Sequence, residues 1–395
     1  MLHAVRLSLA LSLSGVLAAA GEPVAGKAVE LKASDGTRLA ASYFAAPRPG
    51  PGILLLHQCN RERSTWNGLA EQLAGKGFHV LTLDYRGYGE SGGARHTALS
   101  GPERVRLTAE KWPGDVDVAF AYLRAQPGVN GAIIGAGGAS CGVNQSIQLA
   151  RRHPEVKSLA LLSGNTDREG RLYLRTAKLP LLIAAADDDG GIVRTMEFID
   201  ASSGNPANRF LQYAKGGHGT DMFTARPELP GDIVSWYEAS LSGNPLPASR
   251  PRSPGPAARL MVMMDEPGGP ARVAEALAAE RRKDPKSELL AAAFVNQLGY
   301  EAIQGGDARS AIAIMQGNVD ARPNSSNAWD SLGDAYLAAG QPEKALEASR
   351  KSLALVDSDA SETKEQRELI RQSAQQKLDR LKATPGCSPI DSSTT

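Results

Sequence analysis

A serine flanked by small residues is the first group in this sequence that could do chemistry. Gly138-Ala139-Ser140-Cys141-Gly142 fits the pattern G-x-S-x-G and lies between the apolar run 132–134 and the helical pattern 143–152. On a tight strand-to-helix turn the nucleophile sits in strained backbone geometry, and the positions two residues away must be small for strand and helix to pass each other. The helix N-terminus also favours a developing oxyanion. Ser140 is therefore the candidate nucleophile of an acyl transfer.

Cys141 is a rival nucleophile in the same turn. With Cys141 in that role the flanking positions would be Ala139 and Val143, and valine is too bulky for the close passage. With Ser140 both flanking positions are glycine, so we take Ser140. A glycine-rich turn without chemistry is the alternative.

A serine hydroxyl needs a base, and the base needs an orienting acid. Of six histidines, His218 lies beyond the serine in a glycine-bounded loop that directly follows the strand pattern 209–213. Three neighbouring carboxylates, Asp187, Asp188 and Asp189, follow the apolar run 181–185. They cannot all point inward. A metal site is another interpretation of three aspartates, but no further ligands stand nearby in a recognisable pattern, so no metal and no cofactor are expected.

Continuous apolar runs must position these groups. The runs 53–56, 80–83, 132–134, 159–162 and 181–185 lack polar alternation, which suits strands buried on both faces of a parallel sheet. Helical patterns lie between them, at 64–76, 113–126 and 141–153, and residues 28–44 alternate like an antiparallel edge hairpin. The fold class is therefore α/β, a doubly wound, mostly parallel sheet.

Residues 28–243 resemble the α/β-hydrolase superfamily, in its dienelactone hydrolase and esterase-like branch. Besides the serine pentapeptide, the resemblance rests on His57-Gln58-Cys59, where the family usually has His-Gly-x, and on residues 84–91, which resemble D-x-R-G-x-G-x-S. It implies the order serine, acid, histidine, and backbone amides of Cys59 and Cys141 as the oxyanion hole. Gln58 departs from the family's glycine and puts the geometry of that hole in doubt.

The resemblance also indicates which aspartate is the catalytic acid and how open the site is. On the family's spacing after the strand, Asp189 fits best and Asp188 is the runner-up. Segment 163–179 holds only 17 residues, too few for the helical lid that many members insert there. We therefore expect an open, esterase-like site. The long loop 92–112 could cover it in place of a lid.

Cys59, Cys141 and Cys387 are the only cysteines, which is too few for a disulfide framework. We favour Cys59 and Cys141 as two buried free thiols that act as small hydrophobes. The alternative is a disulfide across the oxyanion hole, which requires Cα atoms within ~7 Å of each other.

A proline-rich segment, 244–258, predicts a linker without helix, and everything after it reads as helical. Within 259–383, segments align at an offset of 34 residues, the period of tetratricopeptide helix hairpins. Trp329, Leu332, Gly333 and Tyr336 resemble that family's consensus. Residues 362–382 are expected as a polar capping helix, and the tail 384–395 as disordered.

The N-terminal segment 1–20 reads as a signal peptide, since the apolar run 7–20 ends in three alanines. We therefore expect the signal peptide to be removed, so that the mature protein begins with a domain at 21–243. It should lie in the periplasm or outside the cell and have no stable membrane span. The formal net charge of +1 gives no reason to propose nucleic acid or an anionic membrane as partner.

Two functions from different classes remain. The first is a serine hydrolase acting on small-molecule carboxylic esters, with thioesters or peptides as substrates of the same chemistry. The second is a non-catalytic scaffold, in which helical repeats bind a protein or peptide and the hydrolase domain is degenerate. A peptidase of the prolyl-oligopeptidase type is disfavoured because that type usually carries a propeller.

Overall fold

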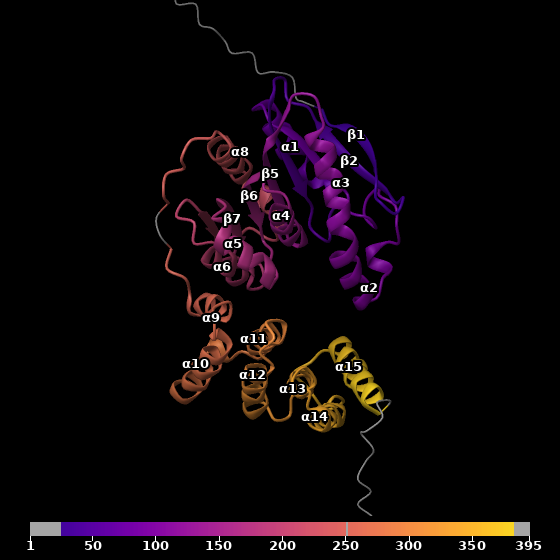
Figure 1. The fold of residues 1–395 in the computed structure, drawn as a ribbon, viewed down its shortest axis with the longest axis vertical. Coiled ribbons are helices and arrows are strands. Elements are labelled where there is room, and N and C mark those ends of the chain that lie inside the picture. Colours follow the sequence, from indigo (N-terminus) through magenta and orange to yellow (C-terminus); the bar gives the residue numbers. More distant parts are fainter. Residues whose placement is uncertain (1–24, 250–251, 383–395) are drawn as a thin grey trace, which may run out of the picture.

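The computed structural model describes residues 25–249 and 252–382. The predicted signal peptide and the predicted disordered tail therefore lie outside the described residues. Figure 1 shows a sheet flanked by helices in the upper part and a layer of helices below it. Among the described residues, no helix is both long and apolar enough to cross a membrane.

Eight strands form one sheet in the order β1-β2-β4-β3-β5-β6-β7-β8. β2 pairs antiparallel with β1 and β4, and all the remaining pairs are parallel. The doubly wound sheet and the antiparallel edge hairpin predicted for 28–44 are confirmed. The strands are β1 Lys27–Lys32, β2 Arg38–Phe44, β3 Gly50–Leu56, β4 His79–Leu83, β5 Val129–Ala139, β6 Val156–Leu162, β7 Leu181–Ala186 and β8 Arg209–Tyr213.

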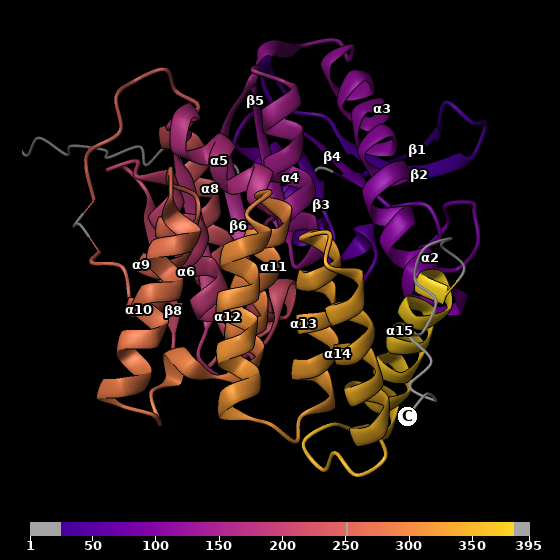
Figure 2. The same ribbon diagram turned by 60° about the horizontal axis from the view of Figure 1, so that its bottom comes forward.

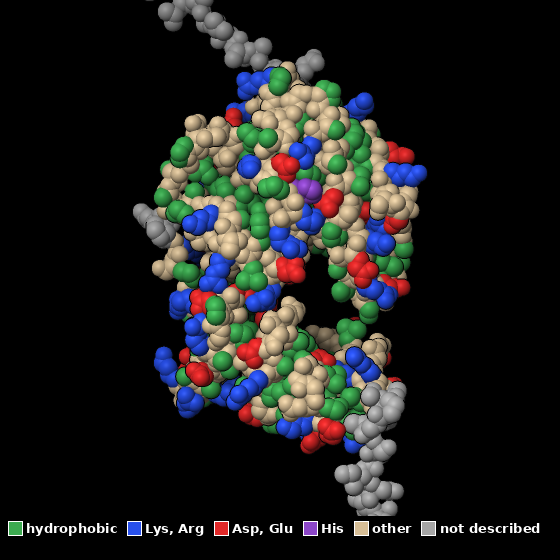
Figure 3. Space-filling view, in the orientation of Figure 1, with side chains coloured by type: hydrophobic (Ala, Val, Ile, Leu, Met, Phe, Trp, Pro, Cys, Tyr) green, Lys and Arg blue, Asp and Glu red, His purple; other side chains and the backbone are tan. Residues whose placement is uncertain are grey.

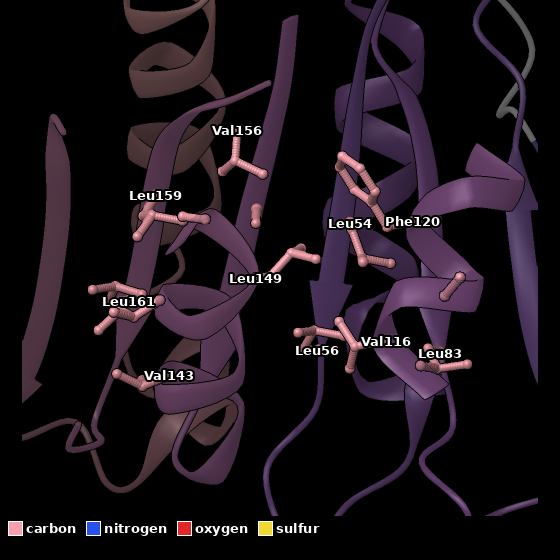
Figure 4. Close-up of a cluster of buried hydrophobic side chains, with 14 of the residues drawn as sticks. Leu54, Leu56, Leu83, Val116, Phe120, Val143, Leu149, Val156, Leu159 and Leu161 are labelled. Atoms are coloured by element: carbon pink, nitrogen blue, oxygen red, sulfur yellow. The ribbon is translucent and has the colours of Figure 1, made fainter. Parts of the chain in front are cut away.

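Helices cover both faces of this sheet. They are α1 Asn67–Gly75, α2 Gly101–Arg106, α3 Trp112–Arg124, α4 Cys141–Arg152, α5 Arg168–Ala177, α6 Ile192–Ser203, α7 Met222–Ala225 and α8 Leu229–Ser240. Since successive side chains of a strand point to opposite faces, β3 sends Leu54 and Leu56 toward α3 and α4, and Leu55 toward α1 and α8. Figure 4 shows the first of these clusters, where Val116, Phe120 and further buried side chains meet the strands. Each fully buried leucine contributes roughly 1.5–3 kcal/mol.

The central strand β5 is longer than the run 132–134 predicted from the sequence. It continues through Gly135 and Gly137, although glycines are more typical of turns than of strands. A Cβ at Gly135 would lie 2.8 Å from the Tyr237 ring, and one at Gly137 would lie 2.7 Å from Leu55. The Tyr237 hydroxyl donates to the Ala136 carbonyl at 2.7 Å. These glycines therefore let α8 pack close to the strand, and the turn itself is confined to Ser140.

Two segments expected to lack helix contain one. In loop 92–112, α2 begins behind a capping box of Ser100 and Glu103, and one π-helical turn, Leu107–Lys111, leads into α3. In the proline-rich segment 244–258, α9 begins at Pro256, because proline is compatible with the first turn of a helix. Both expectations were wrong at these residues.

The described residues after 255 are helical, as predicted, and Figure 2 shows them as a layer of their own. α11 and α13 begin at residues 292 and 326, and α12 and α14 at 308 and 342, so both pairs repeat at the offset found in the sequence. The assignment to tetratricopeptide repeats stays a prediction. The helices are α9 Pro256–Met264, α10 Gly269–Lys283, α11 Ala292–Gln304, α12 Ala308–Ala321, α13 Ser326–Ala338, α14 Pro342–Leu355 and α15 Lys364–Lys382.

A buried arginine on α5 joins the helical layer to the sheet layer. Arg171 is 2% exposed, and its guanidinium donates to Asp265 at 2.9 Å and to Glu301 at 2.6 Å. Beside it, Phe198 of α6 is part of the helical layer's own core, with its ring 6.0 Å from that of Phe294. The two layers therefore share apolar core and a desolvated charge cluster.

Arg171→Ala is expected to destabilise the protein by about 3–5 kcal/mol, because it removes the cation that pairs with the nearly buried Glu301 and leaves the buried Asp265 only the longer contact with Arg168, at 3.4 Å. Arg175→Ala is the matched control: it removes the exposed Arg175–Glu266 pair of the same helix and should cost at most about 1 kcal/mol. Urea unfolding measures both. Equal small losses in the two variants would contradict a shared buried cluster.

Candidate active site

The strand-to-helix turn at Ser140 is as tight as the sequence pattern requires. Ser140 has φ +52°, a left-handed conformation that non-glycine residues rarely adopt, and it ends β5 directly before α4. A Cβ on Gly138 would collide with the Gly142 carbonyl oxygen, and one on Gly142 would collide with the Leu56 carbonyl oxygen. Strand β3, strand β5 and helix α4 therefore meet at van der Waals distance around Ser140. The backbone is strained there, as is common at active sites.

His218 and Asp189 come together at the same edge of the sheet. Asp189 follows β7, and His218 stands between β8 and the 3₁₀ turn Gly219–Asp221. The Nδ1 atom of His218 lies 2.7 Å from Oδ2 of Asp189. Both side chains are partly buried, which strengthens a charge-assisted hydrogen bond. Ser140, His218 and Asp189 all follow carboxyl ends of parallel strands, the edge at which α/β sheets bind their ligands.

The other two aspartates of the run, Asp187 and Asp188, bind groups other than the imidazole. Asp188 accepts the amide hydrogens of Gly216 at 3.0 Å and Gly217 at 3.1 Å, and the Gly217 hydrogen bond is the main cause of the lowered pKa of Asp188. Asp187 accepts from the Gln212 side chain. The runner-up acid thus holds the backbone of the histidine loop, and it is Asp189 that contacts the imidazole.

Ser140 has no hydrogen bond to His218 among the described residues. Catalytic hydrogen bonds are often long in unliganded enzymes and tighten when substrate binds. The structure therefore shows direct contact between Asp189 and His218. Ser140 lies at the same edge of the sheet, where the β5–α4 turn positions it.

Cys59 and Cys141 are joined by a disulfide, with Cα atoms 5.8 Å apart. Our preference for two free thiols was therefore wrong. The physical reason is the neighbouring position of β3 and β5, whose carboxyl ends carry the two cysteines side by side although 82 residues separate them. Continuous apolar runs indicate strands but do not tell which strands are neighbours.

Gln58, the departure from the family pattern, is fully buried and ties two loops together. Its Oε1 accepts from the Thr220 amide at 2.7 Å and from the Thr220 hydroxyl at 3.0 Å, while its Nε2 donates to Asn60 at 2.9 Å. Thr220 stands two residues after His218. Gln58 thus anchors the histidine loop to the loop that carries Cys59, a role that sequence reasoning missed because the partner is 162 residues away.

His57 is fully buried beneath the same loop. Its Nδ1 donates to the Gln58 carbonyl at 2.7 Å and its Nε2 accepts from the Tyr85 amide at 3.2 Å, which fixes the neutral imidazole. Burial lowers the pKa of His57 to about 4. The histidine therefore supports the loop and carries no charge at neutral pH.

Arg86, in the stretch 84–91, pairs with residues far away in sequence. Its guanidinium donates to Asp115 at 2.6 Å and to Asp35 at 2.7 Å. Asp84 accepts the amide hydrogens of Arg63 and Glu90, and the Arg63 guanidinium also binds it. These buried pairs fix the loops after β3 and β4 beside the site.

A cavity of about 650 Å³ opens beside Cys141, on the outer side of α4. Among its charged side chains, Arg151 pairs with Glu169 and Arg152 pairs with Asp117. Asp167 accepts hydrogen bonds from the side-chain amides of Asn144 and Gln148. Its lining includes residues from segments 108–113 and 165–169, around the starts of α3 and α5. The lining residues are Thr108, Ala109, Trp112, Pro113, Cys141, Asn144, Gln145, Gln148, Arg151, Arg152, Asn165, Asp167 and Glu169.

Comparison with known proteins finds similarity over part of the chain. Residues 51–177 match the model of the alpha/beta hydrolase fold family. The uncharacterized protein Rv2307c of Mycobacterium tuberculosis is 33% identical over 132 residues, which cover 33% of this chain and 43% of that protein. Thiohydrolase aneE of Aspergillus aculeatus is 31% identical over 115 residues, covering 28% and 33% of the two chains. The chain thus spans less than half the length of these curated relatives.

Among solved structures, the Pyrococcus furiosus esterase Pf2001 is similar, with 16% identity and a TM-score of 0.46 over 55% of this chain and 92% of that one. This likeness is distant. The sheet order, the helices on both faces and the family match give residues 27–240 the α/β-hydrolase fold. The fold and the family match support a hydrolase. Among the described residues, no three His, Cys, Asp or Glu side chains are grouped so as to hold a metal ion.

Gly138→Ala tests the close passage around Ser140. Its Cβ would meet backbone atoms of Gly142, which cannot move without shifting α4, so we expect a loss of about 2 kcal/mol or more in the free energy of unfolding. Gly114→Ala in α3 is the control, because a Cβ there meets nothing within 4 Å, and it should be neutral or slightly stabilising. Thermal unfolding of both variants gives the comparison; an unaffected Gly138→Ala protein would contradict the packing described.

His57 predicts acid sensitivity. Its pKa in the folded protein, about 4, lies below its ordinary value of 6.5, so the unfolded chain binds the proton more readily between these values. The free energy of unfolding should therefore fall as pH drops from about 6.5 toward 4, by up to about 3 kcal/mol from this group. His57→Gln, whose amide oxygen can still accept from Tyr85, should show a flatter dependence in urea unfolding at pH 7 and pH 4.5. Parallel curves for the two proteins would rule this role out.

Proposed function

We propose that this protein is a serine hydrolase that acts on carboxylic esters, with Ser140 as nucleophile, His218 as base and Asp189 as acid. The observation that carries the proposal is the strained Ser140 at the β5–α4 turn, on the same edge of the sheet as the 2.7 Å contact between His218 and Asp189. This arrangement is what an acyl-enzyme mechanism needs.

In the proposed mechanism, the hydrogen bond to Asp189 keeps the proton of His218 on Nδ1 and leaves the lone pair on Nε2. Nε2 accepts the Ser140 hydroxyl proton while Oγ attacks the ester carbonyl, and the amides of Cys59 and Cys141 bind the oxyanion. The proton then passes to the leaving alcohol as the acyl-enzyme forms. Water, deprotonated by the same imidazole, attacks the acyl-enzyme. The imidazolium then returns the proton to Ser140 Oγ as the bond to the acyl group breaks and the carboxylic acid leaves. Asp189 stabilises the imidazolium in both halves.

The proposed substrate class follows from the openness and polarity of the surroundings. The segment between β6 and β7 carries only the short helix α5, and the cavity beside Cys141 is lined largely by polar side chains that are ion-paired or hydrogen-bonded to one another. We propose esters of modest size with a polar, uncharged portion. Thioesters are the nearest alternative, since the same attack serves them and one relative is named a thiohydrolase.

For the helical layer we propose a packing role on its own hydrolase domain. The buried Arg171 cluster and the shared core around Phe198 favour this over an independent scaffold that binds a protein or peptide. A periplasmic or secreted location is also proposed, and the Cys59–Cys141 disulfide supports it because such bonds persist in oxidising compartments.

Labelling with a fluorophosphonate probe tests the enzyme directly. The parent protein is expected to be labelled, and Ser140→Ala should lose the label while remaining folded by circular dichroism. Ser242→Ala removes an exposed hydroxyl far along the chain and serves as the control that keeps it. A parent protein without label would favour the non-catalytic scaffold, and label retained in Ser140→Ala would reject this nucleophile.

A further inference from the structure

The Cys59–Cys141 disulfide lies at the most sensitive point of the proposed site. Cys141 directly follows Ser140 and is the first residue of α4, and Cys59 stands in the loop after β3. Both cysteines are half-buried, so the bond is within reach of a small reductant. It is the covalent cross-link between the two loops that carry the proposed oxyanion donors.

Both cysteine amides are free to bind an oxyanion. The Cys141 amide belongs to the first turn of a helix, where N–H groups lack an intrahelical acceptor. For the Cys59 amide, the described part of the chain offers no backbone acceptor. The Gln58 carbonyl, which belongs to the same peptide unit as the Cys59 amide, accepts from His57 Nδ1 at 2.7 Å and from the Arg61 amide at 3.1 Å, and these bonds fix the direction of that unit.

The spacing between these two amides depends on few other contacts. The loop after β3 is bound to the loop after β4 by His57 and Tyr88, and to the loop after β8 by Gln58. The disulfide is the covalent link from this loop to the start of α4, where Gly142 also packs against the backbone that leads into the loop. Because oxyanion stabilisation depends on donors held in place before the charge develops, such a link acts on the rate of reaction.

We propose that the Cys59–Cys141 disulfide positions the two oxyanion amides, so that the hydrolase is active when oxidised and impaired when this bond is reduced. The inference rests on the proposed serine-hydrolase function. A dithiol such as dithiothreitol would break the S–S bond and supply two electrons and two protons. Two cysteine thiols form, and the dithiol becomes a cyclic disulfide. Reoxidation by air or oxidised glutathione should restore the link.

The test compares hydrolysis of p-nitrophenyl acetate before and after reduction, in a Cys387→Ala parent so that no third thiol can exchange. We expect kcat to fall by roughly 10- to 100-fold on reduction, less than or close to the loss of a whole donor. KM should change little, because the substrate's ground state does not need the oxyanion hole. Reoxidation should recover the rate.

A matched variant separates the bond from the reductant. In the same parent, Cys59→Ala with Cys141→Ala should show the low kcat of the reduced protein and no response to dithiothreitol. Mass spectrometry after thiol alkylation reports the state of the bond. If the double variant fails to fold, reduction and reoxidation of the parent still decide the question.

Several outcomes would overturn the inference: an unchanged kcat in a protein shown to be reduced, two free thiols in protein purified without reductant, or loss of the circular dichroism signal together with activity. The last would mean that the bond holds the fold and not the amides. Failure of the proposed function is a separate result, since the oxidised parent would then neither hydrolyse the ester nor be labelled at Ser140.

Discussion

The close passage of β3, β5 and α4 around Ser140 is the constraint on which the site depends. Two glycines are required because the Gly142 and Leu56 carbonyl oxygens occupy the space of their side chains. The serine backbone is held at φ +52° as a result, and the helix starts at the next residue. Local strain of this kind persists only when surrounding structure fixes it, and here the fully buried strands beneath it do so.

Around this turn, three loops from distant parts of the chain are fastened to one another. Cys141 is bonded to Cys59, Gln58 next to it binds Thr220, and Thr220 lies two residues from His218. The serine turn and the histidine loop are thus connected through one covalent bond and one buried amide. Asp188 holds the backbone of the histidine loop from the other side, which leaves Asp189 free to orient the imidazole.

Much of this arrangement could be predicted from the sequence, because local patterns determine it. Unbroken apolar runs gave the parallel strands, and the pentapeptide around Ser140 gave the turn. Contacts across the sheet could not be predicted in this way. The partner of Gln58 and the pairing of the cysteines depend on which strand ends are neighbours, and no local pattern records that.

The glycines of β5 and the start of α9 show a second reason for error. Gly135 and Gly137 look like turn residues until Tyr237 of α8, a hundred residues later, is seen to occupy the space beside the strand. Pro256 looks like a helix breaker, yet at the first turn of a helix its missing N–H costs nothing. In both cases the structural role of a residue depends on its position within a helix or strand and not on its type alone.

The position of the helical layer affects how a molecule can approach the candidate site. Arg168 and Arg194, which contact this layer at Asp265 and Phe294, stand in the first turns of α5 and α6, just beyond the carboxyl ends of β6 and β7. The layer therefore lies on the side of the sheet at which the triad candidates gather, and Figure 3 shows an opening between the two parts. A molecule that approaches Ser140 from that side passes helices that belong to the C-terminal part of the same chain.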